Sequence, residues 1–267
     1  MALELLTRKP QTGAIKPTPL LFIHGAWHGA WCWDEYWMPY LVQRGYACYA
    51  PSLRGHGKSP ATKPMRLNSV NDYVSDVESV VERIEREHKQ HPVLIGHSLG
   101  GFVVQKYLEK RQPPAAVLVA SIPTFGALPF FTRLNLKHPI LALKALFTLR
   151  LDPYVKSPKL AREHFFSPDV PQADVDRYAA LLNDESWRTA FDVLILNLPR
   201  PKRVKTPLLV IGGENDKVFH VWEVQRTARS YNTTAVIVPD TAHDMMLDTN
   251  WQVAADHVLA WLAQRGL

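Results

Sequence analysis

The sequence predicts an α/β fold, with a mostly parallel, doubly wound sheet and an inserted helical cap, and three observations carry this prediction. Short apolar runs recur along the chain without alternation, which indicates strands that are buried on both faces. Helical patterns separate these runs, and strands that alternate with helices imply right-handed crossovers and a helix-covered parallel sheet. From residue 122 to residue 205 this rhythm stops, which indicates an insertion.

Six apolar runs are the predicted strands of the sheet. They cover residues 20–24, 46–50, 93–97, 115–120, 208–211 and 235–238. The helices expected between and after them cover residues 33–44, 70–88, 100–111, 221–230 and 251–264. The second of these helices has apolar residues at helical spacing, which are Val70, Val74, Val77, Val81 and Ile84. Residues 2–7 are expected to add an antiparallel strand at the edge of the sheet.

The domain organisation follows from the break in this rhythm. Residues 1–121 and 206–267 are expected to form one core, and residues 122–205 a helical cap in which prolines and helix-like segments replace the alternation. An apolar stretch near the start of the cap contains Phe125, Leu128, Phe130, Phe131, Leu134 and Leu136. Most of these side chains are expected to form the small core of the cap, and a minority to face the substrate, with Phe125, Phe130 and Phe131 as candidates.

Composition argues against several classes of protein. The 267 residues, of which 46% are hydrophobic and 21% charged, have ordinary globular composition. Cys32 and Cys48 offer no disulfide framework and are expected to be buried free thiols. The net charge of +6 is scattered, without the concentrated basic stripe expected of a nucleic-acid-binding protein. No apolar run reaches the roughly 18 residues of a membrane span, so we expect a cytoplasmic protein without stable membrane insertion. We expect this protein to be a monomer or a homodimer.

The most informative motif is Gly-x-Ser-x-Gly at residues 96–100, which follows an apolar strand and opens a helical pattern. A sharp strand-to-helix turn forces its central residue into a strained, left-handed type of conformation, and glycines on either side prevent collisions with the neighbouring backbone. The turn would present Ser98 Oγ at the tip of the sheet. Ser98 is therefore the candidate nucleophile.

A serine hydroxyl needs a base to take its proton and a group to orient that base. Asp216 lies just beyond the predicted strand 208–211, and His243 follows the predicted strand 235–238. Ser98, Asp216 and His243 thus each follow the carboxyl end of a strand, which is the edge where sites assemble in open α/β sheets. The neighbouring carboxylates Glu214, Asp240 and Asp244 are the alternatives to Asp216.

With these residues the chain resembles the α/β-hydrolase superfamily over nearly its full length. Segment 23–31, IHGAWHGAW, matches the family's loop after its third strand, and segment 53–59, LRGHGKS, matches the loop after its fourth. The resemblance implies that the backbone N–H groups of Leu99 and Ala26 form an oxyanion hole. It places the orienting acid on the loop before the histidine, which favours Asp216, with Glu214 as second choice. His24, His56 and His97 lie in family loops where histidines usually support the turn structure.

The segment that contains His24, Gly25 and His28 also resembles a plant branch of methyl esterases and hydroxynitrile lyases. The lyases carry a threonine at the position of Gly25, and a lysine that holds cyanide at the position of Asp244. A carboxylate there would repel the anion, which argues against a lyase. Dehalogenases and epoxide hydrolases of the superfamily have an aspartate where this chain has Ser98. Further candidates for the substrate pocket are Trp27, His28 and Met245.

We therefore expect a serine hydrolase that cleaves an ester of a small or medium carboxylic acid through an acyl-enzyme. No cofactor is expected, and no cluster of His, Cys and carboxylate residues has metal-ligand spacing. Cleavage of a thioester, a lactone or the carbon–carbon bond of a diketone would use similar chemistry. An alternative of another class is a ligand-binding receptor on a hydrolase scaffold, with negligible turnover.

Overall fold

The computed structural model describes residues 2–11, 13 and 15–267. Its centre is a seven-stranded sheet of order β1-β3-β2-β4-β5-β6-β7. The strands are β1 (Leu5–Arg8), β2 (Leu20–Ile23), β3 (Cys48–Pro51), β4 (Val93–His97), β5 (Ala116–Val119), β6 (Leu208–Gly213) and β7 (Ala235–Val238). Only β1 runs antiparallel, paired with β3, and all other strand pairs of the described sheet are parallel. The predicted fold class and the antiparallel edge strand are thus confirmed.

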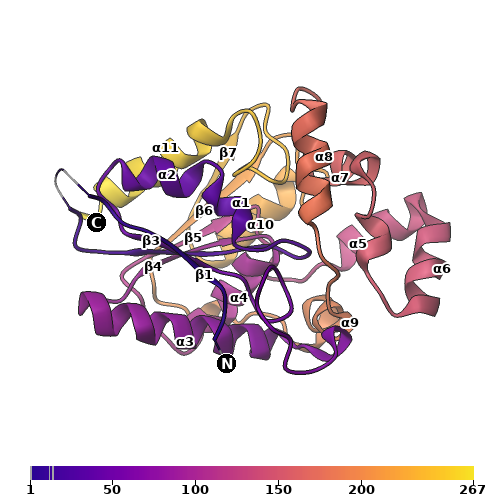
Figure 1. Ribbon diagram of the computed structural model, residues 1–267, viewed down its shortest axis with the longest axis horizontal. Coiled ribbons are helices and arrows are strands. Elements are labelled where there is room, and N and C mark those ends of the chain that lie inside the picture. The colour runs from indigo at the N-terminus through magenta and orange to yellow at the C-terminus, as the bar shows by residue number, and fades with distance from the viewer. Residues whose placement is uncertain (1, 12, 14) are drawn as a thin grey trace.

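Helices cover both faces of this sheet (Figure 1). In the core they are α1 (Trp31–Asp34), α2 (Trp37–Val42), α3 (Val70–His88), α4 (Leu99–Leu108), α10 (Val221–Ser230) and α11 (Trp251–Ala263), and a 3-10 turn covers Met65–Leu67. Helices α2 and α11 lie on one face, and α3 and α4 on the other (Figure 1). One prediction was wrong: segment 33–44 forms parts of two short helices. Tyr36 breaks the helix at φ −130°, and Pro39, which lacks an N–H, then falls in the first turn of α2.

Helix α3 shows how local sequence sets an element of this fold. Ser69 and Asp72 form a capping box at its start, and Lys89 ends it in the left-handed region at φ 57°. All five apolar residues that predicted the helix are buried. The capping residues and the apolar stripe specify the same boundaries, so the predicted range agrees with the observed one.

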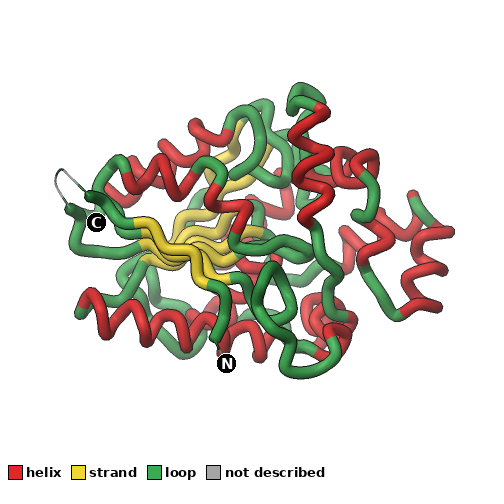
Figure 2. The backbone as a smooth tube through the Cα atoms, viewed as in Figure 1, coloured by secondary structure: helices red, strands yellow, loops and turns green. Residues whose placement is uncertain are grey.

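Between β5 and β6 the chain forms a helical insertion, residues 122–205, in which the described structure contains no strand (Figure 2). It comprises α5 (Leu128–Lys137), α6 (Pro139–Thr148), α7 (Pro158–Phe165), α8 (Gln172–Leu181), α9 (Trp187–Phe191), a π-helical turn at Asp192–Leu196, and 3-10 turns at Asp152–Tyr154 and Pro201–Arg203. Phe130 and Leu134 are buried as expected. Leu128 and Leu136 are exposed, so the expectation that they pack in a core or face a site was wrong.

The two cysteines are buried and free. Burial raises the pKa of the Cys32 thiol well above its usual value, so this group stays protonated and fills space. Among the described residues, no helix combines the length and apolar character that crossing a membrane requires.

Candidate active site

Ser98 lies in a tight turn between β4 and α4. Its backbone has φ 49° and ψ −116°, in a region that residues other than glycine rarely occupy. A Cβ atom on Gly96 would lie 2.5 Å from the carbonyl oxygen of Gly100, and one on Gly100 would lie 2.3 Å from that of Ile23. Any side chain at either glycine would therefore displace the backbone. The glycines are what allows the strand, turn and helix to approach so closely.

His243 and Asp216 are joined by a hydrogen bond at the carboxyl edge of the sheet. His243 Nδ1 lies 2.9 Å from Asp216 Oδ2, and both side chains are buried. The other carboxylate oxygen, Asp216 Oδ1, accepts hydrogen bonds from the N–H groups of Val218 (2.7 Å) and Phe219 (2.9 Å). This leaves Oδ2 as the acceptor for Nδ1–H, so the imidazole keeps its Nε2 lone pair free.

The other carboxylates near His243 do not contact its ring through a hydrogen bond in the described structure. Glu214 is exposed and accepts from the N–H of Asp240 at 3.3 Å, and Asp240 is itself exposed. Asp244 is fully buried but binds His28, with 2.9 Å between Oδ2 and Nε2. Of the carboxylates considered from the sequence, Asp216 is the one that the fold brings to the His243 ring.

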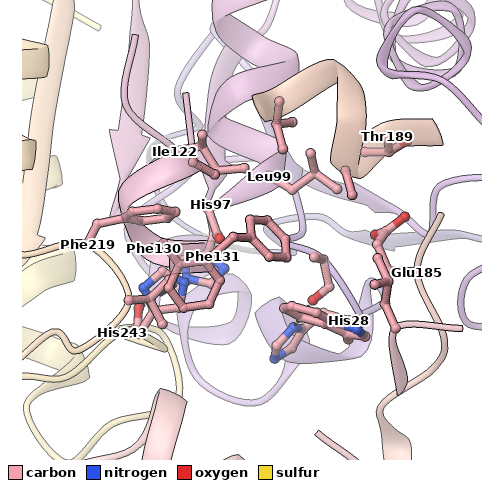
Figure 3. A pocket seen from close by; sticks show the side chains of 18 of the residues that line it. His28, His97, Leu99, Ile122, Phe130, Phe131, Glu185, Thr189, Phe219 and His243 are labelled. Carbon is pink, nitrogen blue, oxygen red and sulfur yellow. Dashed lines mark hydrogen bonds between the residues drawn. The ribbon is translucent and has the colours of Figure 1, made fainter. Parts of the chain in front are cut away.

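Ser98 and His243 line one cavity between the sheet edge and the helical insertion. Figure 3 shows His243 on its wall, across the view from Glu185. The other lining residues are Ala26, Trp27, His28, His97, Leu99, Ile122, Ala127, Phe130, Phe131, Leu151, Phe165, Glu185, Thr189, Ala190, Val193, Val218 and Phe219. Apolar side chains make up most of this wall. Both residues expected to supply oxyanion N–H groups, Ala26 and Leu99, are among them.

Four of the six predicted pocket residues line this cavity, namely Trp27, His28, Phe130 and Phe131. Phe125 does not: it lies in a turn closed by the N–H of Gly126 and stacks on Trp222, with ring centroids 5.8 Å apart. Met245 does not line it either, because its side chain is fully buried in the hydrophobic core. The expectation for these two residues was wrong.

Sequence reasoning missed several lining residues that come from the insertion and from the loop after Asp216. Phe219 lies three residues beyond Asp216, so its proximity had a signal in the sequence. Phe165, Glu185 and Thr189 had none, because their positions depend on how the insertion packs. One contact that fixes this packing is a hydrogen bond of 2.7 Å from the N–H of residue 183 to the carbonyl of Trp27. It joins the insertion to the loop that carries Ala26.

A buried ion pair supports this loop. His28 Nδ1 lies 2.7 Å from the carbonyl oxygen of Ala26, and His28 Nε2 lies 2.9 Å from Asp244. Both ring nitrogens face acceptors, which indicates an imidazolium with an ionised carboxylate. Burial by itself lowers the pKa of His28, but attraction and hydrogen bonding by Asp244 outweigh it and raise that pKa. Burial likewise raises the pKa of Asp244, and His28 overcomes this and lowers it.

Asp244→Asn is expected to lower the free energy of unfolding by about 3 kcal/mol, because breaking a buried pair leaves the partner uncompensated. The raised pKa of His28 contributes stability below its unfolded value of 6.5, and this contribution is lost as pH rises. The lowered pKa of Asp244 contributes above its unfolded value of 3.8, and this contribution is lost as pH falls. Denaturant unfolding should therefore show the largest difference in stability between wild type and Asp244→Asn at pH values between 3.8 and 6.5. Asp240→Asn, on an exposed neighbour, is the control, and a difference independent of pH would contradict the ion pair.

Other histidines hold loops in place. His24 Nε2 accepts from the N–H of Leu53 at 2.9 Å, so its Nδ1–H donates to the carbonyl of Gly25 at 2.8 Å. His97 Nε2 lies 3.1 Å from the carbonyl of His243, to which it donates. Burial lowers the pKa of His97 to about 3, so this ring is neutral. The structural roles expected for His24 and His97 agree with these contacts.

Among the residues that the structure describes, two groups of side chains bring potential metal ligands within 4.8 Å of one another. They are His97, His243 and Asp244, and His138, Glu163 and His164. In the first group His243 Nδ1 faces Asp216 and His97 Nε2 faces a carbonyl, whereas His97 Nδ1 and Asp244 Oδ1 have no hydrogen-bond partner among the described residues. In the second, Glu163 is bound by Lys137 (2.9 Å) and His138 (2.6 Å). The expectation that no metal or other cofactor is needed stays a prediction.

The features of the lyases do not fit this site. A Cβ atom on Gly25 would lie 2.8 Å from His97 Nδ1, so a threonine there would require neighbouring atoms to shift. The described lining includes no lysine or arginine that could hold an anion. Asp244 is not among the lining residues, and it pairs with the His28 imidazolium, so the absence of a lysine, and not repulsion by this carboxylate, argues against a lyase.

Residues 20–257 match the model of the alpha/beta hydrolase family, and the chain belongs to this family. Over 108 residues it is 33% identical to a non-heme chloroperoxidase of Streptomyces lividans, an alignment that spans 39% of this chain and only 37% of that protein. It is 28% identical over 215 residues to the pFDCC methylesterase MES16 of Arabidopsis thaliana, covering 78% of this chain and 80% of that one. The fold is similar to that of an esterase from Exiguobacterium antarcticum, with a TM-score of 0.76, 16% identity, and 98% and 95% of the two chains covered.

Proposed function

We propose that this protein is a serine hydrolase that cleaves carboxylic esters through an acyl-enzyme. The observation that carries the proposal is that Ser98 and His243 line one cavity while Asp216 holds the His243 ring by a hydrogen bond. The strained turn at Ser98 and the free Nε2 of His243 are what acyl transfer to a serine needs. The methylesterase relative, which aligns over most of both chains, supports an ester as the substrate.

In the proposed reaction, Ser98 Oγ attacks the ester carbonyl as His243 Nε2 takes its proton. The carbonyl oxygen becomes an oxyanion, which the N–H groups of Ala26 and Leu99 bind. Leu99 begins α4, where unpaired N–H groups and the helix dipole favour negative charge. The intermediate collapses, and the alcohol leaves with the proton from His243. A water molecule then repeats the sequence on the acyl-enzyme and releases the acid and free Ser98.

The role of Asp216 in this reaction is to orient His243 and to stabilise the imidazolium that forms. The ion pair of His28 with Asp244 holds the carbonyl of Ala26, and so positions the loop whose N–H binds the oxyanion. A thioester, a lactone or the carbon–carbon bond of a diketone would pass through the same sequence of steps. The apolar wall around Ser98 favours an acyl group without charge.

Steady-state kinetics with p-nitrophenyl esters of increasing chain length tests the proposal. We expect many turnovers per protein molecule, and covalent labelling of Ser98 by a small fluorophosphonate. Mass spectrometry would locate the label, and pretreatment with the reagent should abolish turnover. A single slow burst without further turnover would favour a ligand-binding receptor on a hydrolase scaffold instead.

The insertion, residues 122–205, is expected to act as a cap that selects the acyl group, because Phe130 and Phe131 line the cavity. Replacing both with alanine should shift the preferred acyl length upward, in a graded way, since an apolar pocket discriminates by about 1 to 3 kcal/mol per methylene. Ester-panel kinetics would measure the shift. Phe125→Ala is the matched control, because Phe125 lies outside the cavity. Loss of fluorophosphonate labelling, with chain-length preference unchanged, would contradict this role.

A further inference from the structure

The carboxylate of Glu185 lies in the wall of the catalytic cavity and is almost fully buried. Its Oε1 accepts hydrogen bonds from the hydroxyl of Tyr73 (2.7 Å) and from the N–H of Ser186 (2.6 Å). Its Oε2 is buried and has no hydrogen-bond partner among the described residues, although it lies 3.2 Å from His56 Nε2. A buried carboxylate oxygen without a donor is costly, so it calls for an explanation.

The charge at this end of the cavity is set by Glu185 together with His56. His56 Nδ1 faces the carbonyl of Arg54 at 3.3 Å, so Nδ1 carries a hydrogen. His56 Nε2 and Glu185 Oε2 would repel each other as two lone pairs, so one proton lies on this pair, but the two atoms do not make a hydrogen bond. Whichever atom holds that proton, the pair has no net charge. The site therefore offers a hydrogen-bond acceptor to a neutral donor and does not favour a cation.

The other residues on this side of the cavity offer few hydrogen-bonding groups to a substrate. Figure 3 shows Glu185 beside Thr189, across the view from Phe219 and His243. The hydroxyl of Thr189 already donates to the carbonyl of residue 68 at 2.8 Å. Most other lining side chains are apolar, so the carboxylate of Glu185 is the strongest hydrogen-bond acceptor among the described residues on this side of the wall.

We propose that Glu185 determines specificity by accepting a hydrogen bond from a hydroxyl group of the substrate, so that the preferred esters carry a hydroxyl remote from the scissile bond. This rests on the proposed ester hydrolysis. A site built to bind a hydroxyl discriminates against an analogue that lacks it, because the buried acceptor is then left unpaired. A hydroxyl also suits the uncharged pair with His56 better than an ammonium group does.

Two ester pairs, in each of which a methyl group replaces a hydroxyl, test this subsite. They are p-nitrophenyl 6-hydroxyhexanoate with p-nitrophenyl heptanoate, and 4-hydroxybutyl butyrate with pentyl butyrate. The readout is the ratio of kcat/KM within a pair, which a general loss of stability does not change. Wild type should favour the hydroxylated ester in at least one pair, and Glu185→Leu should lower that ratio about 10- to 100-fold. Glu185→Gln, which keeps the shape, should lower it less.

Tyr73→Phe is the matched control, because it removes a hydrogen bond from the same carboxylate outside the cavity lining. An unchanged ratio in both Glu185 variants, or an equal fall in Tyr73→Phe, would overturn the proposal. Calorimetric affinities of Ser98→Ala and Ser98→Ala/Glu185→Leu for the same esters give a second readout that needs no turnover. If Ser98→Ala binds the hydroxylated esters more tightly and the double variant does not, the subsite is supported even if ester hydrolysis fails. Equal affinities within each ester pair for Ser98→Ala would overturn the proposal.

A separate observation concerns the outer surface of the insertion. Helices α5 and α6 and the residues after them carry exposed apolar side chains, which are Leu128, Leu136, Ile140, Leu143, Leu146, Phe147 and Leu149. Ile140 is 79% exposed and Phe147 82%, and only Ala145 of α6 is buried. Figure 1 shows α6 at the edge of the molecule, away from the sheet. Such a patch marks an interaction site on a folded protein.

The charge of the same segment indicates its partner. Residues 128–159 contain six basic residues and one acidic residue. Lys137, Lys156 and Arg150 are exposed beside acidic groups, whereas Lys144 in α6 is exposed with no acidic partner in the described part of the chain. A second copy bound face to face would offer Lys144 a segment whose one acidic residue, Asp152, already pairs with Arg150 and Lys156. An anionic lipid surface accepts both the apolar side chains and the cations, and we infer that this face docks on one.

Sedimentation with vesicles tests this docking. The protein should bind phosphatidylcholine vesicles that contain phosphatidylglycerol more tightly than pure phosphatidylcholine vesicles. Leu143→Ser/Phe147→Ser should weaken binding at least about 10-fold, and Lys144→Glu several-fold, with the latter difference reduced by salt. Leu67→Ser, on an exposed leucine outside the insertion, is the control. Equal binding to both vesicles, or a homodimer in solution that the double variant dissociates, would overturn the inference.

Discussion

Replacing Ser98 with alanine is expected to lower kcat/KM for p-nitrophenyl esters by about three to six orders of magnitude while the fold is retained. The change removes the atom that attacks the ester. His243 then has no serine proton to take, and the orientation of its ring by Asp216 no longer contributes to catalysis. A methyl group fits the turn, because serine and alanine share the Cβ atom. Circular dichroism would check the fold, and steady-state kinetics the activity.

Ser121→Ala is the matched control for this experiment. Ser121 is buried near the same turn, where its Oγ lies 2.8 Å from the side-chain amide of Gln105, but it does not line the cavity. We expect its loss to affect stability more than turnover. A folded Ser98→Ala protein that kept more than about a tenth of wild-type kcat/KM would show that Ser98 is not the nucleophile.

Asp216→Asn is expected to lower kcat by about 10⁴-fold with little change in the fold. The N–H groups of Val218 and Phe219 hold Oδ1, so the amide oxygen of asparagine would take that position. Its NH2 group would then point at His243 Nδ1, which lies 2.9 Å from the atom that it replaces. The donor forces Nδ1 to be the acceptor and moves the ring hydrogen to Nε2, which can then no longer take the serine proton.

Glu214→Gln is the control, because Glu214 is exposed and was the second choice for the orienting acid. It should keep near wild-type kcat. Nuclear magnetic resonance of the ring nitrogens would show the change of tautomer directly in Asp216→Asn. The reverse pattern, with kcat lost in Glu214→Gln and kept in Asp216→Asn, would move the orienting role to Glu214.

Local sequence determined the sheet, most of its helices and the sharp turn at Ser98. Strand β4 and helix α3 coincide with their predicted ranges, because two-sided burial and a capped apolar stripe are local properties of the chain. The glycines around Ser98 likewise predict a sharp turn from local sequence, although the close approach that requires Gly100 is to Ile23 of the neighbouring strand. The meeting of Ser98, Asp216 and His243, which follow β4, β6 and β7, could be predicted because parallel strands end at the same edge of a sheet.

Tertiary structure alone decided which buried polar groups meet and which apolar groups stay exposed. Asp244 lies beside His243 in the chain but pairs with His28, 216 positions away, and Glu185 reaches the cavity only through the packing of the insertion. Leu136 belongs to an apolar stretch yet faces outward. Periodicity and turn residues report the backbone of one segment, whereas burial and the pairing of charges depend on segments distant in sequence. For this protein the elements and the nucleophile turn are therefore local, and the contacts that support and shape the site are not.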